Sequence, residues 1–132
     1  MSDSASKQYT NALKPVRGLG SAKDGTGHFW LQRLTAVALV PLVVVFALCV
    51  ISITGADYEE ARDFLGSPVV AAIAALLLIA GFWHLKLGVQ VVIEDYVHSN
   101  WAKLPALLLN MFGCIALGLA CLIALAAIAF GG

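Results

Sequence analysis

Charged residues are scarce in this sequence and are missing from its longest apolar runs. Of its 132 residues only 12% are charged, whereas 61% are hydrophobic. A soluble domain carries about twice that charged fraction. No Asp, Glu, Lys or Arg falls within residues 34–54 or 104–132, and the run 64–93 contains only Lys86. Each run reaches the roughly 20 residues that a helix needs to cross a bilayer. The sequence therefore predicts an all-α membrane protein with three transmembrane helices.

Signatures of several other protein classes are missing as well. The first apolar run begins only at Leu34 and is too long for the core of a signal peptide, so we expect no cleaved leader. The glycines of residues 18–27 match neither the dinucleotide-binding nor the P-loop pattern. The cysteines form no CxxC pair and are expected to be small packing residues. Nothing in the chain indicates nucleic-acid binding.

We divide the chain into a flexible cytoplasmic segment, residues 1–27, and a three-helix membrane anchor, residues 28–132. The three helices are expected at about 28–54, 67–97 and 104–130. Ser67 followed by Pro68 is a typical helix start, a capping hydroxyl before proline at the first helical position. Pro105 is expected to play the same part for the third helix.

The distribution of Lys and Arg predicts the orientation of these helices. Five of these residues precede the first apolar run, and Lys103 lies in the second loop. The first loop holds Arg62 alone, among four acidic side chains. Because positive loops stay on the cytoplasmic side, we expect the N-terminus and the second loop inside and the first loop and the C-terminus outside.

The second helix carries the residue with the most chemical interest, His84. It precedes Glu94 by ten residues, and so lies about 15 Å below the inner boundary, near the bilayer centre. An ionisable side chain at that depth is a functional hypothesis by default. At ~100° per residue, Gly81, Gly88 and Asp95 fall within about 60° of His84 on the helical wheel. His84 therefore projects from a face cleared by glycines.

Two interpretations of that face stay open on spacing alone. A flat group such as haem could lie against the glycines while the imidazole reaches its iron. Alternatively, the small residues serve close helix packing and His84 hydrogen-bonds across helices. A pair of haems is disfavoured, because the only other histidine on this helix, His98, lies at water level among polar residues. Lys86 lies about 200° from His84 and points away from this face, where it either snorkels or pairs with a partner group.

The residues of this region resemble a known family. His84, followed by the run Asp95-Tyr96-Val97-His98, is similar to the D-type small membrane anchor of succinate dehydrogenase, respiratory complex II. The glycine-rich lead-in 18–27 and the following residues 28–36 are similar to the alphaproteobacterial form. The resemblance covers about residues 16–100.

The resemblance implies specific roles. His84 would be one axial ligand of a haem b and its iron, with the other supplied by a second, cytochrome b-type anchor subunit. Tyr96 would hydrogen-bond ubiquinone, with Asp95 beside it in the same site. Arg33 would lie near a haem propionate, and His28 is a weaker candidate for the same contact. The further partners implied are an iron–sulfur subunit, a flavoprotein subunit and membrane lipid.

The function expected from this resemblance is to anchor a peripheral dehydrogenase to the bacterial inner membrane and to help form its ubiquinone reduction site. Alone, the chain would not be a catalyst. The related fumarate reductase anchor is one alternative, and a non-redox membrane scaffold or transporter subunit is another. A transporter should carry more intramembrane polar groups than His84 and Lys86.

Overall fold

The computed structural model describes residues 22–131, which form four helices and no strand. The three long helices are α2 (Ala22–Ser52), α4 (Pro68–Tyr96) and α5 (Asn100–Phe130). All three are long and apolar enough to span a membrane, which confirms the expected fold class. The helix α3 (Tyr58–Gly66) is short. The described residues up to Leu31 and residues 32–131 are separate units, and the packing below concerns the second unit.

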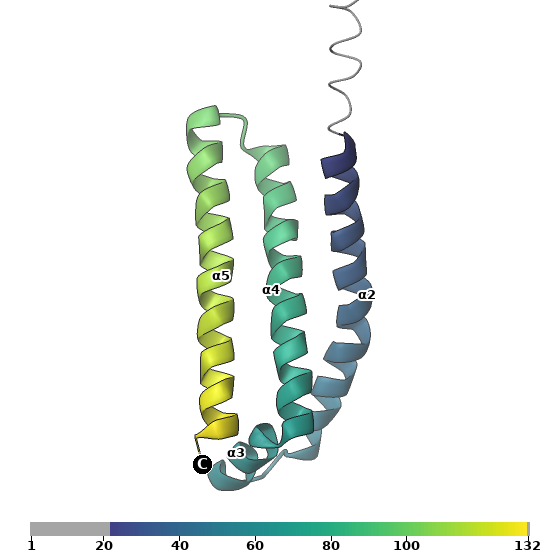
Figure 1. Cartoon of the computed structure of the whole chain (residues 1–132), viewed down its shortest axis with the longest axis vertical. Coiled ribbons are helices and arrows are strands. Elements are labelled where there is room, and N and C mark those ends of the chain that lie inside the picture. The colour runs from purple at the N-terminus through teal and green to yellow at the C-terminus, as the bar shows by residue number, and fades with distance from the viewer. Residues whose placement is uncertain (1–21, 132) are drawn as a thin grey trace, which may run out of the picture. The chain divides into compact units, whose positions relative to one another are not determined.

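Helices α4 and α5 run antiparallel, side by side (Figure 1). Phe82 of α4 lies against Gly118 of α5, where an added Cβ would come within 3.2 Å of the ring. Close to it, the Asn110 amide donates to the backbone carbonyl of Lys86 at 2.9 Å. Small residues that let backbones approach, with polar side chains bonding across helices, are the usual basis of helix association in membranes.

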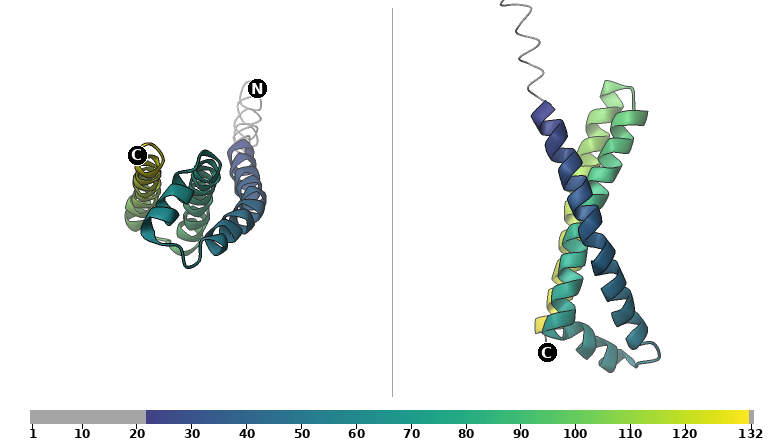
Figure 2. Two further views of the ribbon diagram at one scale, coloured as in Figure 1. Left: turned by 90° about the horizontal axis from the view of Figure 1, so that it is seen from below. Right: turned by 90° about the vertical axis from the view of Figure 1, so that its right-hand side faces the viewer.

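Residues 32–52 of α2 cross α4 obliquely (Figure 2). Contact between them is made by side chains, with Leu39 near Gly81 and Gln32 near Gly88. Pro41 lies within α2, which membrane helices tolerate because neighbouring groups satisfy the freed carbonyl.

The first loop contains α3, a helix that the sequence analysis did not place. Its N-cap is Asp57, whose carboxylate accepts a hydrogen bond from the Glu60 backbone N–H at 2.9 Å. From this helix the Arg62 guanidinium donates to the Gly131 carbonyl at 2.7 Å. Helix α3 thereby ties the first loop to the end of α5.

Two helix starts differ from the expected ones. Helix α2 begins at Ala22 instead of residue 28, because glycine lowers helix propensity by about 1 kcal/mol without forbidding a helix. Helix α5 begins at Asn100 instead of residue 104, since the Ser99 carbonyl already accepts from the Lys103 N–H at 2.9 Å. Pro105 therefore lies inside the helix. The expected flexible segment 1–27 falls outside the described residues up to residue 21.

Large apolar side chains remain exposed along all three long helices, for example Leu34, Leu109 and Ile79. Among the described residues, only three large or small apolar side chains are buried, namely Val70, Ala74 and Leu87. Such a surface is stable only where lipid or other membrane helices cover it.

Candidate functional site

His84 is partly buried on the face of α4 that meets α2. Its Nδ1 lies 3.1 Å from the hydroxyl oxygen of Thr35. The same hydroxyl donates to the backbone carbonyl of Gln32, one turn earlier in α2, at 3.0 Å. The three residues therefore form a short hydrogen-bonded chain from the α2 backbone to the imidazole ring.

The order of donors in this chain follows from its chemistry. A threonine hydroxyl has one proton, and a carbonyl oxygen can only accept. With that proton directed to Gln32, the contact to His84 is a hydrogen bond only if Nδ1–H is the donor. A neutral imidazole protonated at Nδ1 has its lone pair on Nε2, and Nε2 has no hydrogen-bond partner among the described residues. The arrangement leaves His84 with one nitrogen suited to a metal.

The glycines beside His84 are not required by the packing of this chain. A Cβ at Gly81 would meet only Leu39 Cδ2, at 4.0 Å, and one at Gly88 would meet Gln32 Nε2 at 3.6 Å. Both are ordinary van der Waals distances, in contrast to the 3.2 Å at Gly118. Close packing within the chain thus explains Gly118, whereas at Gly81 and Gly88 the side chains of α2 lie at ordinary contact distance and do not by themselves require glycine.

A buried polar atom on the same face lacks a partner. The Gln32 side-chain oxygen Oε1 is shielded from solvent and accepts no hydrogen bond from the described residues. Buried polar groups are nearly always hydrogen-bonded, and an unpaired one costs about 1–3 kcal/mol. The unpaired oxygen could accept a hydrogen bond from a group beyond residues 22–131, and His84 is a residue type that can hold a haem iron.

Two further predicted site residues lie together at the C-terminal end of α4. Asp95 and Tyr96 end α4 and are exposed, the tyrosine by 79%. The turn that follows them connects α4 to α5. Across this turn the Lys103 ammonium donates to the Glu94 carbonyl at 3.3 Å. His98 donates from Nδ1 to the Tyr96 carbonyl at 3.1 Å. The Tyr96 hydroxyl is therefore presented at the surface by an ordered helix end.

Arg33 and His28 both lie on α2 with exposed side chains. Arg33 directly follows Gln32 in the unit that contains His84, whereas His28 belongs to the preceding unit. The structure thus groups His84, Gln32 and Thr35 in one contact chain, and it leaves the roles of the two cationic candidates as predictions.

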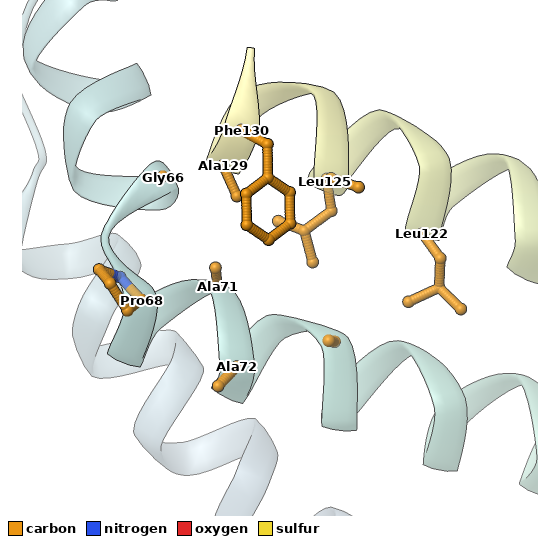
Figure 3. Close-up of a pocket in the computed structure, with 10 residues that line it drawn as sticks. Gly66, Pro68, Ala71, Ala72, Leu122, Leu125, Ala129 and Phe130 are labelled. Carbon is orange, nitrogen blue, oxygen red and sulfur yellow. The ribbon is translucent and has the colours of Figure 1, made fainter. Parts of the chain in front are cut away.

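An apolar cavity lies away from His84. It measures about 440 Å³ and lies where the start of α4 meets the end of α5 (Figure 3). Its lining is mostly apolar, with Ala71 of α4 facing Leu125 and Phe130 of α5. On α4 it reaches only to Ala75, nine residues from His84 and hence about 13 Å away along the helix. It offers no ligating group, so we do not assign it to the site.

The described residues contain no cluster of three or more His, Cys, Asp or Glu side chains that could hold a metal. Any metal at His84 would need its remaining ligands from a macrocycle and from another chain. The three apolar spans define the class of protein, a multi-pass membrane protein.

Comparison with known proteins identifies the family. The chain belongs to the succinate dehydrogenase/fumarate reductase transmembrane subunits, whose family model matches residues 7–129, and it is a membrane anchor subunit of succinate dehydrogenase. It is 34% identical over 106 residues to the succinate dehydrogenase hydrophobic membrane anchor subunit of Paracoccus denitrificans, covering 80% of this chain and 82% of that one.

Two further relatives agree. The succinate dehydrogenase membrane anchor subunit of Reclinomonas americana is 30% identical over 93 residues, 66% of this chain and 75% of its own length. The corresponding hydrophobic membrane anchor subunit of Rickettsia bellii is 33% identical over 85 residues, covering 64% and 68% of the two chains. No solved structure matches the chain significantly. The resemblance inferred from the residues around His84 and Tyr96 is thereby confirmed at the level of the family.

Sequence reasoning missed Gln32 and Thr35. Both stand three residues apart in the run 28–36, so they share one face of a helix. Polar residues at that spacing in an otherwise apolar span were the available signal, but only the structure places them beside His84.

Proposed function

We propose that this membrane anchor subunit co-ligates a haem b through His84 and forms part of a ubiquinone reduction site around Tyr96. The observation that supports the haem most strongly is the state of the imidazole. Its Nδ1 lies 3.1 Å from the Thr35 hydroxyl, which leaves Nε2 as the nitrogen that could bind a metal, on a face of α4 that carries Gly81 and Gly88.

In this proposal His84 would hold the haem iron through Nε2, and a cytochrome b-type anchor subunit would supply the other protein ligand. The described part of this chain has no second histidine at that depth, since His98 bonds the Tyr96 carbonyl at the helix end. Haem b would supply a one-electron centre inside the membrane. The guanidinium of Arg33 would pair with a propionate, with His28 as a weaker contact to the same groups.

Ubiquinone would bind at the inner end of α4. The Tyr96 hydroxyl is exposed and can donate a hydrogen bond to a quinone carbonyl oxygen, while Asp95 lies next to it. Aromatic side chains with one polar tip are favoured at this depth of the membrane. The electrons would arrive from an iron–sulfur subunit, itself fed by a flavoprotein subunit, both docked on the inner face.

The same proposal fixes the topology. The N-terminus and the turn between α4 and α5 would lie in the cytoplasm, and α3 and the C-terminus in the periplasm of a bacterial inner membrane. The acidic helix α3, with Glu59 and Glu60 in its first turn, suits the outer side by this rule.

A substitution of Tyr96 tests the quinone part. Tyr96→Phe removes only the hydroxyl, and we expect quinone reduction by the purified complex to fall about tenfold, as for the loss of one hydrogen bond of about 1.4 kcal/mol. Succinate oxidation with an artificial dye should be retained, because the dye does not use this site. A loss of both activities in parallel would mean misassembly, and retention of both would remove Tyr96 from the site.

The reduced-minus-oxidised absorbance spectrum of the purified wild-type complex tests the whole proposal. A b-type haem band is expected in it if the anchor is a redox component. A complex that assembles and oxidises succinate without any haem band would make the chain a non-redox scaffold. Comparing succinate oxidation with fumarate reduction in the same preparation would distinguish the succinate dehydrogenase direction from the reverse one.

A further inference from the structure

The hydrogen-bonded chain from Gln32 through Thr35 to His84 has a consequence for the imidazole beyond holding it in place. The two contacts of the Thr35 hydroxyl, 3.0 Å to the carbonyl and 3.1 Å to Nδ1, are both within hydrogen-bond range. They can be satisfied together in only one way, with the hydroxyl donating to Gln32 and accepting from His84.

The opposite arrangement is disfavoured for a simple reason. If the hydroxyl donated to Nδ1, its oxygen would face the Gln32 carbonyl oxygen at 3.0 Å with no proton between them. The imidazole proton would then be on Nε2, and that nitrogen could not bind a metal. The carbonyl of Gln32 belongs to the α2 backbone, so the direction of the whole chain is set by a group that cannot change its role.

We propose that Thr35 is a positioning residue that fixes the Nδ1–H tautomer of His84 and so selects Nε2 as its iron-binding nitrogen. This inference rests on the proposed haem ligation and adds the residue that controls it. It also assigns a function to the contact between α2 and α4, because the tautomer is set from one helix and the ligand is carried by the other.

The contact between Thr35 and His84 should also lower the midpoint potential of the haem iron. When the nitrogen that does not bind the iron donates a hydrogen bond, the iron-binding nitrogen of the histidine becomes more basic. A more basic ligand favours the ferric state. Outer-shell partners of this kind change metal affinity by roughly 10–100-fold when they are removed. At the lower end, a tenfold loss of preference for ferric over ferrous haem raises the midpoint potential by about 59 mV.

The experiment is a redox titration of haem b in the purified complex, made for four variants. Thr35→Val keeps the shape of the side chain but removes the hydroxyl, and Thr35→Ser restores it. Thr54→Val is the matched control, because the hydroxyl of Thr54, just after the end of α2, donates to the Val50 carbonyl at 3.4 Å and has no contact with His84. His84→Ala reports whether the haem depends on the ligand at all.

We expect Thr35→Val to raise the potential by tens of millivolts, about 59 mV for a tenfold effect. Its ferric low-spin electron paramagnetic resonance signal should shift too, while Thr35→Ser and Thr54→Val stay close to wild type. Loss of haem in Thr35→Val with full retention in Thr35→Ser would support the inference as well. An unchanged potential in Thr35→Val would overturn it, and so would equal loss of haem in Thr35→Val and Thr35→Ser.

The two proposals fail in different ways. If the haem band survives in His84→Ala, the proposed ligation is wrong, whatever the Thr35 variants do. If it disappears in His84→Ala but the potential ignores Thr35, the ligation stands and only the positioning role is lost.

Discussion

The side of α4 that faces α5 and the side that faces α2 differ in how closely they pack. Towards α5 the helix packs closely, with Phe82 against Gly118 and an interhelical hydrogen bond from Asn110 to the Lys86 carbonyl. Towards α2 the glycines meet nothing closer than 3.6 Å, His84 keeps a free nitrogen, and a buried oxygen of Gln32 has no donor. The side of α4 towards α5 is closely packed within the chain, whereas the side towards α2 makes looser contacts and leaves one buried oxygen unpaired among the described residues.

The contrast shows that a glycine in a membrane helix has two separate meanings. At Gly118 the missing Cβ is needed because an aromatic ring occupies its place. At Gly81 and Gly88 a Cβ would make ordinary contacts, so nothing in the described residues requires glycine there. Small-residue spacing in a sequence does not separate the two cases, and the haem interpretation of this face stays a proposal.

The largest effect is expected on the side of α4 towards α5. Gly118→Leu drives a branched side chain into the Phe82 ring, and overpacking of this kind costs about 3 kcal/mol, the upper part of its usual range. Thermal unfolding of the purified complex should occur at a clearly lower temperature. Gly113→Leu is the matched control on α5, because a Cβ there meets nothing within 4 Å. Equal destabilisation by both variants would contradict the assigned packing.

A smaller and different effect is expected on the side of α4 towards α2. Gly88→Leu places a branched side chain against Gln32, whose Nε2 lies 3.6 Å from the position of a Cβ, and beside the proposed haem, so we expect a cost of about 1–2 kcal/mol or roughly a tenfold lower haem affinity. Haem content per anchor subunit is the measurement. If Gly88→Leu instead lowers the unfolding temperature as much as Gly118→Leu while haem content is unchanged, the two faces do not differ as described.

The smallest effect is expected from Asn110. Replacing it with leucine removes one interhelical hydrogen bond, which in membrane proteins is worth about 0.6 kcal/mol on average. The unfolding temperature should fall slightly and the haem spectrum should stay unchanged. A spectral shift in Asn110→Leu would mean that the α5 face also communicates with the haem.

Much of the fold could be predicted from the sequence because charge is so unevenly distributed. Three runs without charge, apart from Lys86, are enough to predict three spanning helices, and the residues around His84 and Tyr96 are enough to suggest the family. Helix α3 could have been predicted from Asp57 followed three residues later by Glu60, a capping-box pattern.

The candidate site was less accessible to sequence reasoning. His84 is conspicuous because an ionisable group is costly at mid-membrane depth. Thr35 and Gln32 are ordinary polar residues within α2. Their contact with His84 depends on how α2 crosses α4, which no local sequence pattern encodes. The predicted start of α5 is four residues too late, because the prediction places Pro105 at the first position of the helix and proline can also occupy an early helical turn.

The central claim is that His84, on the side of α4 towards α2, binds a haem shared with a neighbouring subunit. The most direct test is the haem b content of the purified complex carrying His84→Ala, measured per anchor subunit and compared with Lys86→Met on the opposite side of the same helix. We expect the haem to be lost or its spectrum strongly altered in His84→Ala and to be unaffected in Lys86→Met. A normal amount of spectrally unchanged haem b in an assembled His84→Ala complex would contradict the account.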